Sequence, residues 1–356
     1  MGTERQLRCV IAAGGTAGHV LSALAVAEAL TAHGVLVTFA GSPDRVEAQL
    51  VPEAGFELDT FRISGFERKP SLALARALGR AVVAPRACRA ILRRRKPDVV
   101  FGGGGYVAGP MVLAAASLSI PAAVSEADAH LGLANRLAAP LAKRVFLAYP
   151  VEGRAGAKYQ VVGRPIPARA RSIPQAAARE LFDLPAEAPV LLVAGALAGA
   201  RALNELVVDA FAESGPAILH ISGDRDFSSL QGRVSRSDYR LIARTDQIGA
   251  AYSAADLVLA RAGSSVWELA AAGRPAILVP YPFATADHQA KNADYFVRAG
   301  GAVMVREDAL ATVPDLVRGL LDDSERRKTM GEAMLAAALP DAAEQIAKEL
   351  IALAAV

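Results

Sequence analysis

The sequence predicts an α/β protein built from two Rossmann-like halves, and three observations carry this prediction. Short apolar runs alternate with helical patterns along the chain, which is typical of parallel sheets. The alternation stops at residues 163–167 (G-R-P-I-P), a stiff passage suited to an interdomain hinge, and then restarts. With 356 residues, the chain has room for two domains at roughly 150 residues each.

The strands and helices are expected in regular alternation. The first half has expected strands at 7–13, 35–40, 98–101, 122–125, 144–148 and 159–162, and helices at 20–33, 110–118 and 133–140. The second half has expected strands at 190–194, 217–222, 239–243, 257–260 and 276–279, and helices at 201–213 and 266–272. Because Pro340 breaks the last helical stretch, we expect domains over 1–163 and 164–340, and a final helix over 341–356 that crosses back to the first domain. Two Rossmann-like domains facing each other across a cleft form the GT-B fold, which is the predicted architecture.

Composition narrows the class of partner. Lys and Arg number 39 against 36 Asp and Glu, a balance too weak to indicate nucleic acid. The two cysteines, Cys9 and Cys88, form neither a disulfide framework nor a metal-binding spacing, which fits a cytoplasmic setting. The polar start does not read as a signal peptide, and no run of about 18 apolar residues indicates a transmembrane helix. Any membrane contact is therefore expected to be peripheral.

One basic stretch stands out between Arg68 and Lys96. Arginine and lysine recur along it, with leucine, valine and isoleucine between them. A basic amphipathic stretch without a membrane span fits docking on an anionic lipid surface. A solvated helix that packs by one face fits the same residues equally well.

Two glycine loops follow predicted strands in the first half. The first runs from Gly14 to His19, where glycines let backbone amides approach a ligand and the next helix offers its N-terminus to an anion. His19 is a candidate base because imidazole titrates near neutral pH, although the loop also fits a plain strand-to-helix turn. The second runs from Gly102 to Tyr106, and four consecutive glycines indicate backbone brought close to a ligand or to the facing domain.

Polar groups follow other predicted strands. Glu126 and Asp128 fit either hydrogen bonds to substrate hydroxyls or a cap on the helix that begins near Leu131. Ser264 and Ser265, with the first amides of the next helix, are suited to a pyrophosphate. Other candidates have two interpretations each. Glu268 fits a ribose ligand or a first-turn carboxylate that favours the helix dipole, and Arg201 fits a phosphate contact or an ordinary helix residue. The D-H-Q-x-x-N stretch from Asp287 fits a sugar ligand or a capped helix.

Taken together, the motifs resemble those of the MurG family, the N-acetylglucosaminyltransferases of peptidoglycan synthesis. G-G-T-x-G-H-V, G-G-Y-V-x-G-P, G-L-x-N-R, R-A-G-S-S-V-W-E-L-A-A-A-G-R-P and D-H-Q-x-x-N-A occur in family order over nearly the whole chain. The resemblance implies a GT-B enzyme that needs no metal or cofactor. Its first domain would bind the acceptor and dock on the anionic cytoplasmic face of the cell membrane, and its second would bind UDP-GlcNAc. The implied reaction is inverting transfer of GlcNAc to the 4-hydroxyl of undecaprenyl-pyrophosphoryl-MurNAc-pentapeptide, which converts lipid I to lipid II with a β-1,4 linkage.

The resemblance also implies roles for individual residues. His19 would be the base, assisted by Glu126. The implied substrate contacts are Thr16, Ala17 and Gly18 near the donor phosphates or sugar, Ser264, Ser265 and Val266 at the pyrophosphate, Glu268 at the ribose, Gln289 at the GlcNAc hydroxyls, the backbone from Thr245 to Ile248 at the uracil, and Gly104, Tyr106 and Asn135 within the matched motifs. Arg261 would support its loop rather than touch the sugar.

The chain departs from the family pattern at four places, one of which is a second-domain loop that is one residue shorter before Glu268. Asp128 stands where an Asn that contacts the donor is usual, and Leu197 and Ala198 replace a Ser and a Gln. The usual G-N-P-V-R is G-R-P-I-P here, so Arg164 is the candidate substitute for the missing Arg. These departures leave three alternatives open: a related transferase acting on a glycolipid or natural product, a UDP-GlcNAc epimerase, and a non-catalytic nucleotide-sugar-binding subunit.

Overall fold

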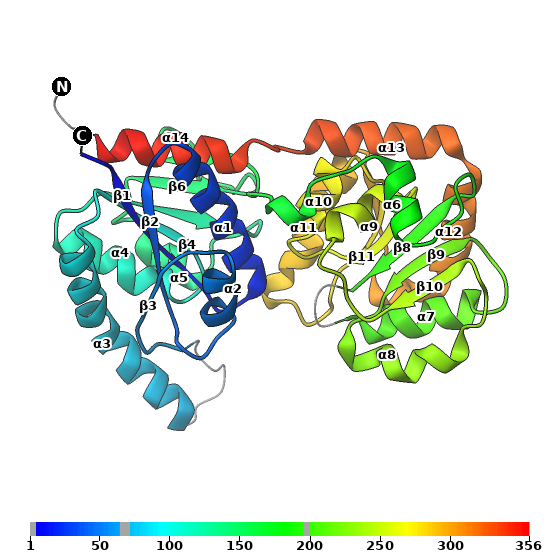
Figure 1. Cartoon of the computed structure of the whole chain (residues 1–356), viewed down its shortest axis with the longest axis horizontal. Coiled ribbons are helices and arrows are strands. Elements are labelled where there is room, and N and C mark those ends of the chain that lie inside the picture. Colours follow the sequence, from blue (N-terminus) through cyan, green and yellow to red (C-terminus); the bar gives the residue numbers. More distant parts are fainter. Residues whose placement is uncertain (1–4, 65–71, 196–198, 356) are drawn as a thin grey trace. The chain divides into compact units, whose positions relative to one another are not determined.

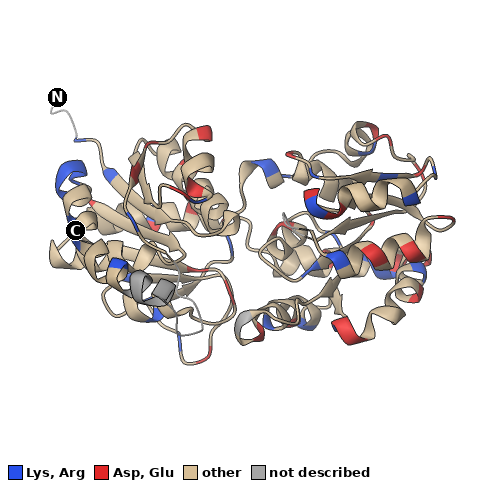
Figure 2. Cartoon of the chain, turned by 90° about the horizontal axis from the view of Figure 1, so that it is seen from below, with Lys and Arg blue, Asp and Glu red and all other residues tan. Residues whose placement is uncertain are grey.

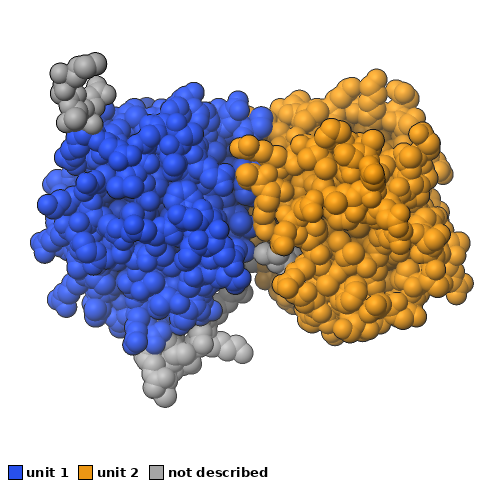
Figure 3. All heavy atoms as spheres, viewed as in Figure 1, with its two compact units in different colours: residues 1–167, 340–356 blue, residues 168–339 orange. Residues whose placement is uncertain are grey.

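The computed structural model describes residues 5–64, 72–195 and 199–355, which form two compact units (Figure 3). Unit 1 comprises Met1–Pro167 with Pro340–Val356, and unit 2 comprises Ala168–Leu339. The chain therefore passes from one unit to the other at Pro167, four residues beyond the expected boundary at 163. Its return to unit 1 falls at Pro340, the proline expected to break the helical stretch.

The described part of unit 1 contains a parallel sheet in the order β3-β2-β1-β4-β5-β6-β7. Its strands are β1 (Arg8–Ala13), β2 (Leu36–Gly41), β3 (Leu58–Thr60), β4 (Val99–Gly104), β5 (Ala122–Glu126), β6 (Arg144–Leu147) and β7 (Tyr159–Val161), and its helices are α1 (Ala17–Ala32), α2 (Glu47–Glu53), α3 (Leu72–Arg95), α4 (Ala108–Ser117), α5 (Leu133–Ala138) and α14 (Ala342–Ala354). Strand order reverses between β1 and β4, and open α/β sheets bind ligands at such a switch point. The two glycine loops of the first half leave these two strands.

Hydrophobic clusters cover both faces of the unit 1 sheet. Helices α3, α4 and α5 contribute to one cluster, and α1 and α14 contribute to the other. Ile346, Ala347 and Leu350 of α14 are buried in the same cluster as Val20 and Leu30 of α1. The C-terminal helix therefore packs beside the first helix of the chain, red beside blue in Figure 1.

Unit 2 repeats the plan with the strand order β10-β9-β8-β11-β12-β13 and a switch point between β8 and β11. Its described strands are β8 (Val190–Ala194), β9 (Ala217–Ile221), β10 (Tyr239–Ile242), β11 (Leu257–Arg261), β12 (Ala276–Val279) and β13 (Ala302–Met304), and its helices are α6 (Gln175–Leu181), α7 (Arg201–Phe211), α8 (Asp224–Leu230), α9 (Ile248–Ala254), α10 (Val266–Ala271), α11 (His288–Arg298), α12 (Val313–Asp322) and α13 (Ser324–Ala337). The central strands are buried on both faces, which explains their continuous apolar sequences.

Every strand expected from the sequence is present, with ends shifted by up to three residues. The expected helix 20–33 begins earlier, at Ala17, so Ala17, Gly18 and His19 lie in its first turn rather than in the loop. Two strands were missed, β3 and β13, which are three residues long and lie at sheet edges.

Candidate active site

The first glycine loop ends at the N-terminus of α1. Thr16 is the N-cap residue, with extended backbone and no side-chain hydrogen bond to the helix amides. Its hydroxyl lies instead 3.1 Å from Nδ1 of His19, one turn into the helix. This contact orients the imidazole ring in the first turn.

The second glycine loop closes on the first. The amide of Gly14 donates to the carbonyl of Gly104 at 3.4 Å. A Cβ added to Gly104 would lie 2.6 Å from the His19 ring, and one added to Gly105, where φ is +77°, would lie 2.1 Å from the carbonyl oxygen of Gly14. The run of glycines therefore lets the second loop approach the first glycine loop and His19 closely. Tyr106 packs over Gly15, and its buried hydroxyl has no hydrogen-bond partner among the described residues, an unsatisfied group suited to a ligand.

Glu47 of α2 supports the first loop from below and was not found by sequence reasoning. Its side chain is fully buried, with one carboxylate oxygen accepting from the amide of Gly15 and the other from the amide of Ser42, each at 3.0 Å. Because its carboxylate is buried and accepts from two backbone amides, Glu47 fixes the first glycine loop against the loop that follows β2. This seven-residue helix holds two glutamates, Glu47 and Glu53, and nothing in the local sequence distinguishes the buried one for this role.

Electrostatics keep His19 neutral. Burial, the largest cause, and the charge of Arg164 lower the pKa of its imidazole to about 4, while Asp128 and a backbone hydrogen bond to Gly14 act in the opposite direction. Arg164 is 6% exposed, and its guanidinium donates to the carbonyl of Gly18 at 2.7 Å. At pH 7 the imidazole is therefore in the form that accepts a proton.

Glu126 lies at the carboxyl end of β5 and is buried. Its carboxylate accepts from the amide of Gly132 at 2.8 Å, the side-chain amide of Asn135 at 2.9 Å and the amide of Asp128 at 3.2 Å. Burial raises the pKa of Glu126 despite these hydrogen bonds. Gly132 is the N-cap of α5, so Glu126 also anchors that helix, two residues later than the expected start near Leu131. Asn135 lies behind Glu126 and positions it.

His19, Glu126 and Arg164 share one small cavity. The other lining residues are Ser22, Gly103, Ser125, Ala127, Ala148, Gly163 and Pro165. The structure thus brings together the two expected catalytic residues and the candidate substitute arginine, all within unit 1.

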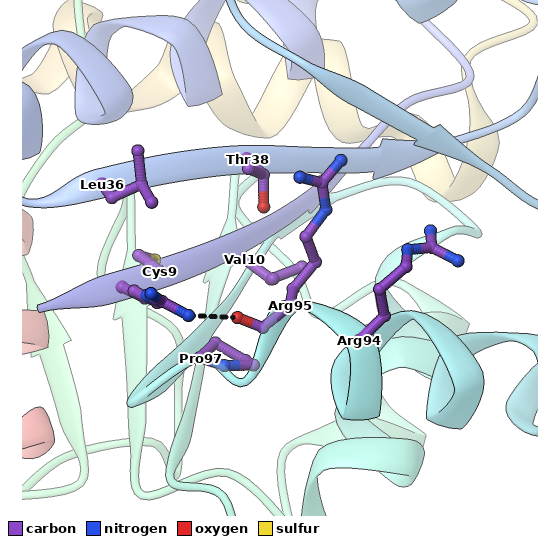
Figure 4. A pocket seen from close by; sticks show the side chains of 8 residues that line it. Cys9, Val10, Leu36, Thr38, Arg94, Arg95 and Pro97 are labelled. Atoms are coloured by element: carbon purple, nitrogen blue, oxygen red, sulfur yellow. Dashed lines mark hydrogen bonds between the residues drawn. The ribbon is translucent and has the colours of Figure 1, made fainter.

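A larger cavity of unit 1, of about 190 Å³, opens at the amino ends of β1 and β2 (Figure 4). Cys9, Thr38, Arg94 and Arg95 are among its lining residues. Both arginines donate to the carboxylate of Asp59, at 2.6 to 3.1 Å, and hold its pKa low against the opposing effect of burial. This cavity lies at the amino ends of the strands, opposite the glycine loops, and its Arg94 and Arg95 are paired with Asp59.

In unit 2, the loop after β11 lies at the switch point. Ser264 and Ser265 are partly exposed and precede α10, whose first residue is the buried Val266. Glu268, in the first turn of α10, accepts from the hydroxyl of Tyr252 at 2.9 Å. The loop after β8 reaches this edge too, but Leu197 and Ala198 lie outside the described residues.

The remaining predicted residues of unit 2 lie after β10, β11 and β12. Arg261 is 8% exposed and donates to Glu307 at 2.5 Å and to the carbonyl of Pro280 at 3.3 Å, which ties its loop to the neighbouring strand end. Gln289 accepts from the amide of Tyr281 at 2.8 Å. Thr245 follows β10, with its hydroxyl accepting from the amide of Gln247 at 3.0 Å, and Ile248 begins α9. Asp287 is the N-cap residue of α11 with φ of +53°, as the helix interpretation placed it, but its carboxylate makes no hydrogen bond to the helix amides and accepts from Arg306 at 3.1 Å instead.

A buried polar network joins α7, β9, α8 and β10 and was also missed. Asn204 donates to the carbonyl of Ser222 at 2.9 Å and to Asp226 at 3.0 Å, and its oxygen faces Nε2 of His220 at 3.0 Å. Nδ1 of His220 faces the hydroxyl of Tyr239 at 2.8 Å. Asp226 also receives two hydrogen bonds from Arg225. Within the described residues there is no group of three or more His, Cys, Asp or Glu side chains arranged to hold a metal ion.

Comparison with known proteins gives the family. Two family models match, Glycosyltransferase family 28 N-terminal domain over residues 9–147 and Glycosyltransferase family 28 C-terminal domain over 190–346. The chain is 43% identical over 354 residues to the UDP-N-acetylglucosamine--N-acetylmuramyl-(pentapeptide) pyrophosphoryl-undecaprenol N-acetylglucosamine transferase of Acidithiobacillus ferrooxidans, covering 96% of each chain.

Solved structures agree. MurG of Acinetobacter baumannii superposes with a TM-score of 0.80 at 28% identity, covering 97% of this chain and 99% of that one. The calicheamicin glycosyltransferase CalG4 shares the fold, with a TM-score of 0.71 at 19% identity over 98% of each chain. The fold prediction is thereby confirmed, and the chain belongs to glycosyltransferase family 28 and, within it, to the MurG family of GT-B enzymes.

Proposed function

We propose that the chain transfers GlcNAc from UDP-GlcNAc to the 4-hydroxyl of undecaprenyl-pyrophosphoryl-MurNAc-pentapeptide, forming lipid II. Matches to both family 28 domains and the names of relatives at 39–43% identity support this reaction. The observation that carries it is the neutral His19, held by Thr16 in a cavity it shares with Glu126.

In the proposed step, His19 accepts the proton of the acceptor 4-hydroxyl as the oxygen attacks C1 of the donor sugar. The bond between C1 and the phosphate oxygen breaks, and UDP leaves from the opposite face with inversion. A neutral imidazole at the N-terminus of α1 is suited to this, since a base must be unprotonated at working pH. Glu126 faces the same cavity and assists by orienting the acceptor.

Unit 2 holds the donor in this proposal. Ser264, Ser265 and the amide of Val266 bind the diphosphate at the N-terminus of α10, where backbone dipoles stabilise the departing negative charge. Glu268 binds the ribose, Gln289 the GlcNAc hydroxyls, and the backbone from Thr245 to Ile248 the uracil.

We further propose that unit 1 docks on the anionic cytoplasmic face of the membrane through α3. No helix of the described residues is long and apolar enough to span a membrane. On α3, Val82 and Val83 are 77% and 55% exposed between the exposed Arg80 and Arg86. Figure 2 shows the Lys and Arg residues of the chain in blue. Exposed valines flanked by cations favour insertion at a negatively charged surface.

The docking proposal is tested by vesicle flotation. The protein should float with vesicles containing phosphatidylglycerol and not with pure phosphatidylcholine, and Val82→Asp/Val83→Asp should abolish flotation. Leu335→Asp, which alters a half-exposed residue of unit 2, is the matched control and should float as wild type does. Equal flotation of the Val82/Val83 variant would disprove the role of α3.

One assay tests the reaction itself: UDP release from UDP-GlcNAc and other UDP sugars, with and without the lipid-linked muramyl-pentapeptide. UDP release that requires both the lipid acceptor and UDP-GlcNAc is expected, and His19→Ala should lower kcat by about 10²- to 10⁴-fold. Normal turnover by His19→Ala would refute the base assignment. Epimerised sugar without acceptor would indicate an epimerase, and tight UDP-GlcNAc binding without turnover a non-catalytic subunit.

A further inference from the structure

Arg164 occupies an unusual position for a buried cation. It follows β7 in the segment 163–167, one residue after a glycine with φ of +80°. The side chain is 6% exposed, and its guanidinium donates to the carbonyl of Gly18, 146 residues earlier in the sequence. Burying a guanidinium costs free energy unless its hydrogen bonds are satisfied, so the hydrogen bond to Gly18 helps to offset the cost of burying Arg164.

The contact fixes the residue directly before the base. Gly18 and His19 lie in the first turn of α1, where glycine allows the backbone freedom that a hydrogen bond to its carbonyl removes. Arg164 also lines the cavity that His19 and Glu126 share. Arg164 therefore affects the proposed base in two ways, by holding the backbone of Gly18 and by placing a positive charge near the His19 ring.

Several charged or titratable groups surround the His19 ring. Arg164 from the segment after β7 disfavours the imidazolium, and Asp128 from the loop after β5 favours it. Glu126 lines the same cavity but is tied to α5 by three hydrogen bonds, and Glu47 of α2 is held by the amides of Gly15 and Ser42. Arg164 is thus the cation whose charge acts on the ring.

We infer that Arg164 is a positioning residue for the base, which fixes the Gly18–His19 turn and places a buried positive charge beside it, in place of the substrate contact that the family pattern implies for its arginine. This inference rests on the proposed function, in which His19 is the base. It also accounts for Pro167 at the family's arginine position, because the cation three residues earlier serves unit 1 instead.

The test is the titration of His19, followed by NMR in histidine-labelled protein, together with the pH profile of kcat/KM. Removing the charge by Arg164→Gln should raise the His19 pKa, and with it the acidic limb of the profile, by about one pH unit. Loss of the Gly18 contact should lower kcat by about tenfold at the optimum. Arg164→Lys keeps the charge and should leave the titration in place while kcat falls.

Arg154→Gln is the matched control, since it removes an exposed arginine of unit 1 and should change neither measurement. An unmoved His19 titration in Arg164→Gln, with a raised KM for UDP-GlcNAc, would overturn the inference and restore a donor contact. Absence of lipid-dependent UDP release by the wild type would overturn the proposed function, which the NMR titration does not depend on.

Discussion

The two histidines with lowered pKa values differ in their surroundings. His220 is fully buried between Tyr239 and Asn204, and burial lowers its pKa to about 4. His19 has a pKa of about 4 as well, but it is partly exposed and lines a cavity. In the proposed function, access to the cavity allows His19 to exchange a proton with a substrate, whereas the buried His220 affects folding stability.

His220 should make folding stability depend on pH. The unfolded residue binds a proton below its ordinary pKa of 6.5, and the folded one only below about 4. The stabilisation is therefore complete above pH 6.5 and declines as the pH falls toward 4, by on the order of 3 kcal/mol. Urea unfolding of unit 2 at several pH values should show this loss, and His220→Gln should flatten it. An unchanged slope in the variant would contradict the assignment.

Gly105 offers a clean test of backbone strain beside the base. Gly105→Ala places a Cβ 2.1 Å from the Gly14 carbonyl at a φ of +77°. Gly34 has the same φ with no atom within 4 Å, so Gly34→Ala carries the backbone cost alone, about 1 kcal/mol. Only Gly105→Ala should also displace the His19 loop and lower kcat by about tenfold or more. Equal kcat values for the two variants would contradict the packing of the loops.

At the scale of the element, alternation of strands and helices was readable because parallel strands buried on both faces have continuous apolar sequences, as in β8 and β11. The edge strands β3 and β13 were not readable, because three residues carry too little pattern. Ala17 to His19 were assigned to a loop because the glycines and threonine before them are typical of loops. The start of α1 also has no hydrogen bond from a capping side chain.

The loops of the candidate site could be predicted because they follow strands next to a switch point. Their supports could not, since these are contacts between distant residues. The hydrogen bond from Arg164 to Gly18, the carboxylate of Glu47 under Gly15, and the partners of Asn204 all depend on the folded chain. Local sequence carries the ligand-facing groups, and tertiary packing decides what holds them in place.

The Asn204 network should govern donor binding more than acceptor binding. It holds the Ser222 carbonyl, against which Gly199 packs so closely that a Cβ would lie 2.2 Å away. Asn204→Ala leaves buried polar groups unpaired and should destabilise unit 2 by about 3 kcal/mol. The KM for UDP-GlcNAc should rise about tenfold while the KM for the lipid acceptor stays constant.

The control for this variant is Glu205→Ala, the next residue on α7. Glu205 is half-exposed and pairs with Arg233 at the surface, so its loss should cost at most about 1 kcal/mol and leave both KM values unchanged. A parallel rise of both KM values in Asn204→Ala would mean that the network supports the fold without favouring the donor loops.

At the scale of the whole molecule, the two units have separate hydrophobic cores. The unit 1 cores include Ile346 and Leu350 of the C-terminal helix, and the unit 2 core is built from residues between Leu191 and Met330. The chain thus crosses from unit 1 to unit 2 and returns, so α14 completes a core whose other elements are more than 150 residues earlier. Separate cores favour separate unfolding transitions.

Calorimetry should resolve separate unfolding transitions for the two units. Ile346→Asp buries an unpaired charge against α1 and should lower the transition of unit 1 by several degrees while leaving that of unit 2 in place. Gln345→Asp puts the same group on the exposed face of α14 and should change neither transition. UDP, which the proposed donor site of unit 2 binds, should raise only the transition temperature of unit 2. At a hundredfold excess over Kd, it should increase the free energy of unfolding of that unit by about 2.7 kcal/mol. If Ile346→Asp lowered both transitions together, the units would unfold as one, and α14 would stabilise the whole enzyme rather than unit 1 alone.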